Sequence, residues 1–177
     1  MVNVYCVKWG TKYDRSFVEK LKESIEKHFT IEHKFNCFTD RPEKDYDIPL
    51  THPELRGVWH KLSLFQFTGE NLFFDLDIKI NDNINFLTDE WKTFTCIDSS
   101  PWKKHKLSTL AINNDTLINT SIMRWTDNKK VFDKFIEKNS GNESTWRTTF
   151  SRIGQTEAGD KIILVQGTAL KELKRNI

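Results

Sequence analysis

The chain has 177 residues, which is long enough for a single domain with a substantial hydrophobic core. Its 37% hydrophobic and 29% charged residues are typical of a soluble globular protein and exclude a disordered or membrane-embedded one. The 27 basic and 25 acidic side chains give a net charge of +2, so nothing indicates a nucleic-acid partner.

The apolar runs and the cysteines predict a cytoplasmic protein. No apolar run approaches membrane-spanning length and the N-terminal residues lack a signal-peptide pattern, so we expect no transmembrane segment. Cys6, Cys37 and Cys96 are odd in number and widely spaced, which indicates neither a zinc site nor a disulfide framework. Cys6 and Cys37 lie in apolar runs, and we expect them to be buried thiols.

The first 40 residues predict a strand, a helix and a second strand. Residues 2–7 are β-branched and aromatic, and residues 33–38 form the second strand-like run. Apolar side chains recur at helical spacing through residues 15–29, with Asp14 or Ser16 as the candidate N-cap. This order is typical of a parallel sheet with crossover helices.

Ligands of such sheets bind beyond the carboxyl ends of the strands, so the loops at those ends are the first candidate site. Residues 9–13 form a polar loop with an aromatic ring at each end, and Gly10 allows a tight turn there. Thr39 and Asp40 follow the second strand. Residues 43–57, with two prolines, predict a loop, and residues 59–67 predict a short helix.

Residues 72–80 carry the most specific chemistry. In an extended strand, the two-residue period places Asp75 and Asp77 on the same side. Two such carboxylates repel each other unless a positive charge lies between them, and Mg²⁺ or Mn²⁺ suits carboxylate oxygens. The alternative is a solvent-facing acidic edge of an ordinary strand, because Asp-x-Asp is common by chance.

The second half of the chain predicts further strands at residues 92–97, 117–125 and 161–166. A helix is expected over residues 129–137, and the basic tail over residues 170–177 is expected to be helical.

Three blocks of the chain, in this order, resemble the A-type glycosyltransferases, closest to the glycogenin and lipopolysaccharide galactosyltransferase group. The first is the N-terminal strand, polar loop and helix. The second runs from Trp59-His60-Lys61-Leu62-Ser63-Leu64-Phe65 to Phe73-Phe74-Asp75-Leu76-Asp77, and the third is Ile118-Asn119-Thr120-Ser121-Ile122-Met123.

The resemblance implies a single α/β domain over residues 1–177, with a mostly parallel central sheet flanked by helices. Within it, residues 1–80 correspond to a nucleotide-binding part, residues 81–170 to an acceptor side and residues 171–177 to a basic tail.

In the family that the chain resembles, the two Asp-x-Asp acids hold Mn²⁺ or Mg²⁺, and the metal binds the diphosphate of a nucleotide-sugar. The resemblance gives Asp75 and Asp77 this role. The family's third ligand is a histidine near the C-terminal end, and Gln166 stands at that place here. A Gln carbonyl oxygen suits a hard cation, although it is a weaker ligand than imidazole toward Mn²⁺.

The resemblance also implies donor-binding residues, to which Asp75 belongs through its metal. Trp9, Gly10 and Tyr13 match the loop that seats the nucleotide base, and either ring offers a stacking surface. Lys61 corresponds to a basic residue near the donor phosphates or sugar, and Asn119 to an asparagine that orients a sugar. The alternatives are core packing for the rings, a solvated charge for Lys61, and a buried amide bonded to loop backbone for Asn119.

The function implied is a metal-dependent glycosyltransferase that moves a sugar from a nucleoside-diphosphate sugar, most commonly a UDP-sugar, to an unknown acceptor with retention. No carboxylate is identified as a nucleophile or base. Two alternatives stay open: a degenerate transferase that binds nucleotide or sugar without turnover, and a non-enzymatic interaction domain on a reused fold.

Overall fold

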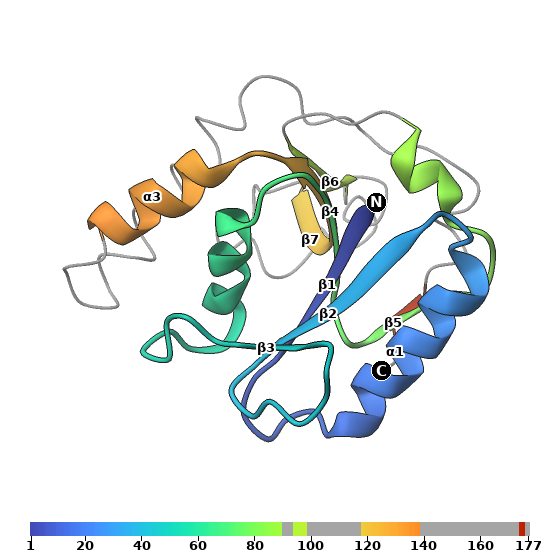
Figure 1. Ribbon diagram of the computed structural model, residues 1–177, viewed down its shortest axis with the longest axis horizontal. Coiled ribbons are helices and arrows are strands. Elements are labelled where there is room, and N and C mark those ends of the chain that lie inside the picture. The colour runs from blue at the N-terminus through green and yellow to red at the C-terminus, as the bar shows by residue number, and fades with distance from the viewer. Residues whose placement is uncertain (90–93, 99–117, 139–173, 176–177) are drawn as a thin grey trace, which may run out of the picture.

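The computed structural model describes residues 1–89, 94–98, 118–138 and 174–175 (Figure 1). One six-stranded sheet has the order β3-β2-β1-β4-β7-β6. Its strands are β1 (Val2–Lys8), β2 (His33–Thr39), β3 (Asp47–Pro49), β4 (Glu70–Phe74), β6 (Phe94–Asp98) and β7 (Ile118–Thr126). The helices are α1 (Arg15–His28), the 3₁₀ helices η1 (Gly57–Gln66) and η2 (Asn85–Thr88), and α3 (Lys129–Lys138).

The predicted fold class is confirmed. Strands β3, β2, β1 and β4 are mutually parallel, whereas β7 pairs antiparallel with both β4 and β6. Helix α1 crosses over between β1 and β2, as the N-terminal pattern predicts, and helices flank the sheet (Figure 1). Within the described ranges, no helix is both long and apolar enough to cross a membrane.

Alternate residues of the central strands enter two hydrophobic cores, one on each face of the sheet. Val4 and Cys6 of β1 pack with residues of α1, whereas Tyr5 packs with residues of η1 and α3. Helix α1 lies on one side of the sheet and α3 on the other (Figure 1). Helix α1 contributes Val18, Leu21 and Ile25 to its core. Cys6 and Cys37 are buried thiols, which confirms that expectation, and Cys96 is buried as well.

The N-terminal cap of α1 is Asp14, whose carboxylate accepts a hydrogen bond from the Ser16 amide at 2.8 Å. The prediction of a continuous loop over residues 43–57 is wrong, because Asp47–Pro49 pairs with the end of β2 as an edge strand. An edge strand tolerates proline because one side of it makes no ladder hydrogen bonds.

The C-terminal tail was expected to be helical, but its described part forms a short strand, β8 (Lys174–Arg175). It pairs antiparallel with β5 (Ile78–Lys79). The strand predicted at residues 161–166 lies outside the described residues.

The Asp-x-Asp stretch is not an extended strand, so the two-residue period does not place its carboxylates. Strand β4 ends at Phe74, and the Ile78 amide donates to the Asp75 carbonyl at 3.1 Å, which closes a turn. The alternation of burial nevertheless continues through this turn, because Leu76 and Ile78 join the core beneath α1 as Leu72 and Phe74 do.

Candidate functional site

Because β1, β2 and β4 are parallel, their carboxyl ends lie at one edge of the sheet. The segments that leave this edge begin with Trp9, Asp40 and Asp75. Strand β7 runs the other way, so its first residues lie at the same edge, and the Asp75 amide donates to the Ser121 carbonyl at 2.8 Å. The edge therefore brings together both loops and the acidic turn that the sequence singled out.

Asp75 forms an ion pair with Lys61, with 2.7 Å between Oδ1 and Nζ, and the two side chains are 26% and 16% exposed. The Lys61 ammonium also donates to the Thr120 carbonyl at 3.3 Å and lies 4.9 Å from the centroid of the Phe73 ring. The ammonium is thus held by a carboxylate, a carbonyl and a ring face. The resemblance implied that Lys61 lies near the donor phosphates or sugar, and it did not predict the pairing with Asp75.

Asp77 is half-buried and lies in the same turn as Asp75. The pKa of the nearby Lys12 ammonium is raised, first by its contact with Tyr13 and also by the negative charges of Asp77 and Asp75. Asp75 and Asp77 therefore share one short turn, whose geometry differs from that of the predicted strand.

Two carboxylates fit a hard divalent cation that takes its remaining ligands from water and phosphate, which is how Mg²⁺ commonly binds. Across the described ranges, no cluster of three or more His, Cys, Asp or Glu side chains could hold a metal. Gln166, the third ligand implied by the resemblance, lies outside those ranges. Of the three metal ligands that the resemblance implies, Asp75 and Asp77 therefore lie in the described part of the chain.

The loop after β1 is held by hydrogen bonds at Gly10. Its amide donates to Asp40 Oδ2 at 3.1 Å, and its carbonyl accepts from Lys8 Nζ at 3.3 Å. Gly10 has φ +66°, a conformation that favours glycine. Trp9 beside it is 38% exposed, and its ring centroid lies 5.5 Å from that of His60. One aromatic surface is therefore available at the edge of the sheet.

Tyr13, at the other end of this loop, lies differently from Trp9. It is half-buried against the core beneath α1, and its ring centroid lies 4.9 Å from that of Phe17. These contacts favour the core-packing alternative for Tyr13.

His60 is fully buried, and neither ring nitrogen has a hydrogen-bond partner of normal geometry among the described residues. Burial lowers the pKa of His60, while the charges of Asp40 and Glu54 and the backbone of Leu55 act in the opposite direction. The imidazole is thus a neutral support beneath Trp9. For Asn119, the structure describes the backbone alone, which pairs with Ile97 at the start of β7.

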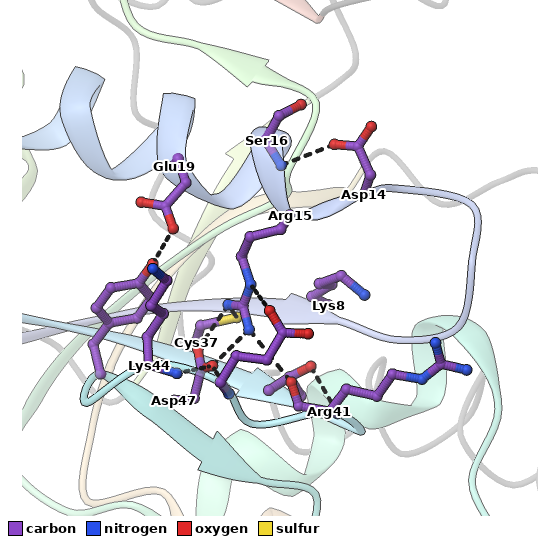
Figure 2. A network of polar contacts seen from close by, with 12 residues as sticks. Lys8, Asp14, Arg15, Ser16, Glu19, Cys37, Arg41, Lys44 and Asp47 are labelled. Carbon is purple, nitrogen blue, oxygen red and sulfur yellow. Dashed lines mark hydrogen bonds and ion pairs between the residues drawn. The ribbon is translucent and has the colours of Figure 1, made fainter.

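A second polar cluster, which the sequence analysis missed, fixes the neighbouring loop. Figure 2 shows Arg15 reaching from the first turn of α1 to Asp47 of β3, with nitrogen–oxygen distances of 2.8 and 2.6 Å. Asp47 also accepts hydrogen bonds from the Glu43 and Lys44 amides at 2.7 and 2.9 Å. We call this the Arg15–Asp47 clasp. It closes the loop that carries Asp40, the residue bonded to Gly10.

Comparison with known proteins shows the fold. No protein-family model and no curated protein matches the chain. Glycosyltransferase GlyE of Streptococcus pneumoniae TIGR4 is structurally similar, with a TM-score of 0.56 at 9% identity over 87% of this chain and 43% of GlyE. Its apo form gives 0.55 at 10% identity, over 93% and 44% of the two chains.

Galactosyltransferase LgtC, solved with donor and acceptor sugar analogs, gives 0.48 at 11% identity over 85% and 66% of the two chains. The fold assignment rests on GlyE, whose score is the higher. The chain has an A-type glycosyltransferase-like fold, as its sequence predicts. It spans less than half the length of GlyE.

Proposed function

We propose that this domain is a metal-dependent glycosyltransferase that uses a nucleoside-diphosphate sugar, with a UDP-sugar as the first candidate. The observation that carries the proposal is the acidic turn of Asp75 and Asp77. It lies directly after a central parallel strand of an A-type glycosyltransferase-like fold, at the edge that also presents Trp9.

In this proposal, Asp75 and Asp77 hold Mn²⁺ or Mg²⁺, with Gln166 as a third ligand. The metal supplies positive charge that offsets the negative charge developing on the leaving diphosphate. The exposed ring of Trp9 stacks on the base, in the loop shaped by Gly10. Lys61 and Asn119 contact the donor phosphates or sugar.

The transfer breaks the bond between the anomeric carbon and the phosphate oxygen, and the electron pair leaves with the nucleoside diphosphate. The acceptor oxygen bonds to the same carbon, and its proton passes to the departing phosphate or to water. We propose retention at this carbon, as in the family that the sequence resembles. We assign no catalytic base.

A second candidate function is nucleotide or sugar binding without turnover. The Lys61–Asp75 ion pair favours it, because a carboxylate that is already neutralised by an ammonium is a poorer metal ligand. An interaction domain on the same fold is the third possibility.

A thermal-shift and product-release assay tests these functions. A panel of donors is added with Mn²⁺ or Mg²⁺, and both the melting temperature and the released nucleoside diphosphate are measured. A ligand that binds only the folded state raises its stability, so a metal-dependent rise is expected with the correct donor. Release of nucleoside diphosphate identifies a transferase, and a rise in melting temperature without release identifies a binder. If neither a rise nor a release is observed, both candidate functions are contradicted.

Substitutions at the acidic turn connect the result to the site. Asp75→Asn and Asp77→Asn are each expected to abolish metal-dependent nucleotide binding while leaving the fold intact. Asp133→Asn is the matched control, because Asp133 is an exposed acid on α3. If both turn variants bound the donor as well as the parent does, the metal assignment would be wrong.

A further inference from the structure

The unexplained feature of the acidic turn is the ammonium that it already holds. Lys61 Nζ lies 2.7 Å from Asp75 Oδ1, and both side chains are largely shielded from water. Salt screens such a pair less than it screens an exposed pair. The pair involves a carboxylate that the proposed function gives to the metal, so the ammonium and the metal compete for the same oxygen.

We propose that Lys61 is an internal counter-ion of Asp75, which the divalent metal must displace in order to bind, so that Lys61 sets the metal affinity of the site. This inference rests on the proposed function, because it concerns the same metal. It makes Lys61 a positioning residue that acts on the site through Asp75.

Geometry makes the two cations exclusive at this oxygen. Mg²⁺ binds carboxylate oxygens at roughly 2.0–2.1 Å. An ammonium that stayed at 2.7 Å from the same oxygen would lie only a few ångströms from the metal, where like charges repel strongly. The flexible four-carbon stem of lysine allows the ammonium to move away, and Thr120 already offers it a carbonyl.

The cost of this exchange reduces the metal affinity. Ion pairs with solvent access are worth roughly 0.2–1 kcal/mol, which corresponds to a factor of up to about five in an equilibrium constant. The site consequently binds a divalent ion weakly when no phosphate is present. Phosphate oxygens supply further ligands to the ion, so the pair favours metal and nucleotide binding together.

Lys12 provides a matched comparison within the same site. Its charge also acts on both carboxylates, but its ammonium lies 4.8 Å from the Tyr13 ring centroid and the side chain is exposed. Removing either lysine deletes one positive charge near the turn. Only the removal of Lys61 also breaks the direct ion pair with Asp75.

The experiment measures Mn²⁺ affinity without nucleotide, by electron paramagnetic resonance of the free ion, for the parent, Lys61→Met, Lys61→Arg and Lys12→Met. The expected result is two- to fivefold tighter binding for Lys61→Met, from the value of the pair. Lys61→Arg restores the charge and is expected to bind as weakly as the parent. Lys12→Met is expected to change the affinity less than Lys61→Met does.

Unchanged or weaker Mn²⁺ binding by Lys61→Met would overturn the counter-ion role and leave the proposed metal site standing. An equal increase in Mn²⁺ affinity for Lys12→Met would also overturn the counter-ion role, because the loss of any nearby positive charge would then explain the result. Mn²⁺ binding that Asp75→Asn leaves unchanged would remove the metal site itself, and the inference with it.

A second measurement uses the parent protein, so it does not depend on whether the Lys61 variants fold. Acetylation of the Lys61 amine is followed by mass spectrometry with and without Mn²⁺. The metal is expected to increase the reactivity of this amine by releasing it from Asp75. Equal or lower reactivity with bound Mn²⁺ would contradict the exchange.

Discussion

Replacing Arg15 with methionine tests whether the Arg15–Asp47 clasp fixes the loop beside the candidate site. The substitution keeps a long side chain but removes both charged hydrogen bonds to Asp47. The Asp47 side chain is 0% exposed, and in the variant it would keep only the hydrogen bonds from the Glu43 and Lys44 amides. A buried carboxylate would therefore lose its counter-charge.

The magnitude follows from the burial of the two partners. Removing one partner of a buried ion pair costs about 3–5 kcal/mol. The Arg15 side chain is 18% exposed and two backbone donors remain on Asp47, so we expect a cost at or below the lower end of this range, about 2–3 kcal/mol. For a domain of this size, that corresponds to a melting temperature lower by roughly 4–12 °C.

The loss of stability in Arg15→Met is also expected to depend on pH. Burial raises the pKa of Asp47, but the hydrogen bonds from Arg15 and from the two backbone amides lower it more, to below its ordinary value of 3.8. A carboxyl group with a lowered folded pKa contributes stability above its unfolded pKa and loses it as pH falls through the folded pKa. The difference in stability between the parent and Arg15→Met is therefore at its maximum at pH 7 and becomes smaller below about pH 4.

Thermal melts of the parent, Arg15→Met and Arg41→Met between pH 3 and pH 8 would measure this. Arg41→Met is the control, because Arg41 is exposed and contributes its backbone carbonyl to the clasp. If Arg15→Met melted together with the parent at pH 7, or if the gap stayed constant at acidic pH, the clasp would not stabilise the loop as argued.

Two further predictions address the cap of α1 and the aromatic loop. Asp14→Ala removes the hydrogen bond to the Ser16 amide and should lower the melting temperature, whereas Asp14→Asn should retain most of the stability. An unchanged melting temperature for Asp14→Ala would contradict the capping role. Trp9→Ala should weaken nucleotide binding about tenfold, if the ring stacks on the base with typical energy. Tyr13→Phe is the control and should bind the nucleotide as the parent does. If calorimetry gave equal nucleotide affinities for Trp9→Ala and the parent, Trp9 would not belong to the site.

The strands could be predicted where the pattern is local. The apolar run of β1 packs into the cores on both faces of the sheet, and the helical spacing of α1 serves one of these cores, so in each case a short window of sequence contains the signal. The same logic failed at Asp75 and Asp77. There, a hydrogen bond from the Ile78 amide to the Asp75 carbonyl closes a turn, although Leu76 and Ile78 keep the alternation of burial that Leu72 and Phe74 begin.

The polar contacts could not be predicted, because their partners are distant in sequence. Arg15 and Asp47 are 32 residues apart, and no spacing rule joins the first turn of a helix to a proline-containing edge strand. Lys61 and Asp75 meet only after η1 and β4 take their places beside β7. Sequence reasoning identified these last two residues as site residues, and their pairing emerged only from the structure.

The register of β1 and β2 places Cys6 directly opposite Cys37, with both side chains at 0% exposure. Burial, followed by the contact with Cys37, raises the pKa of the Cys6 thiol, so this sulfur stays protonated and unreactive while the sheet is closed. A thiol reagent can reach Cys6 only when the core between α1 and the sheet opens. The rate at which Cys6 is labelled therefore reports how often this core opens, and this natural probe lies on the strand that leads into the loop that carries Trp9.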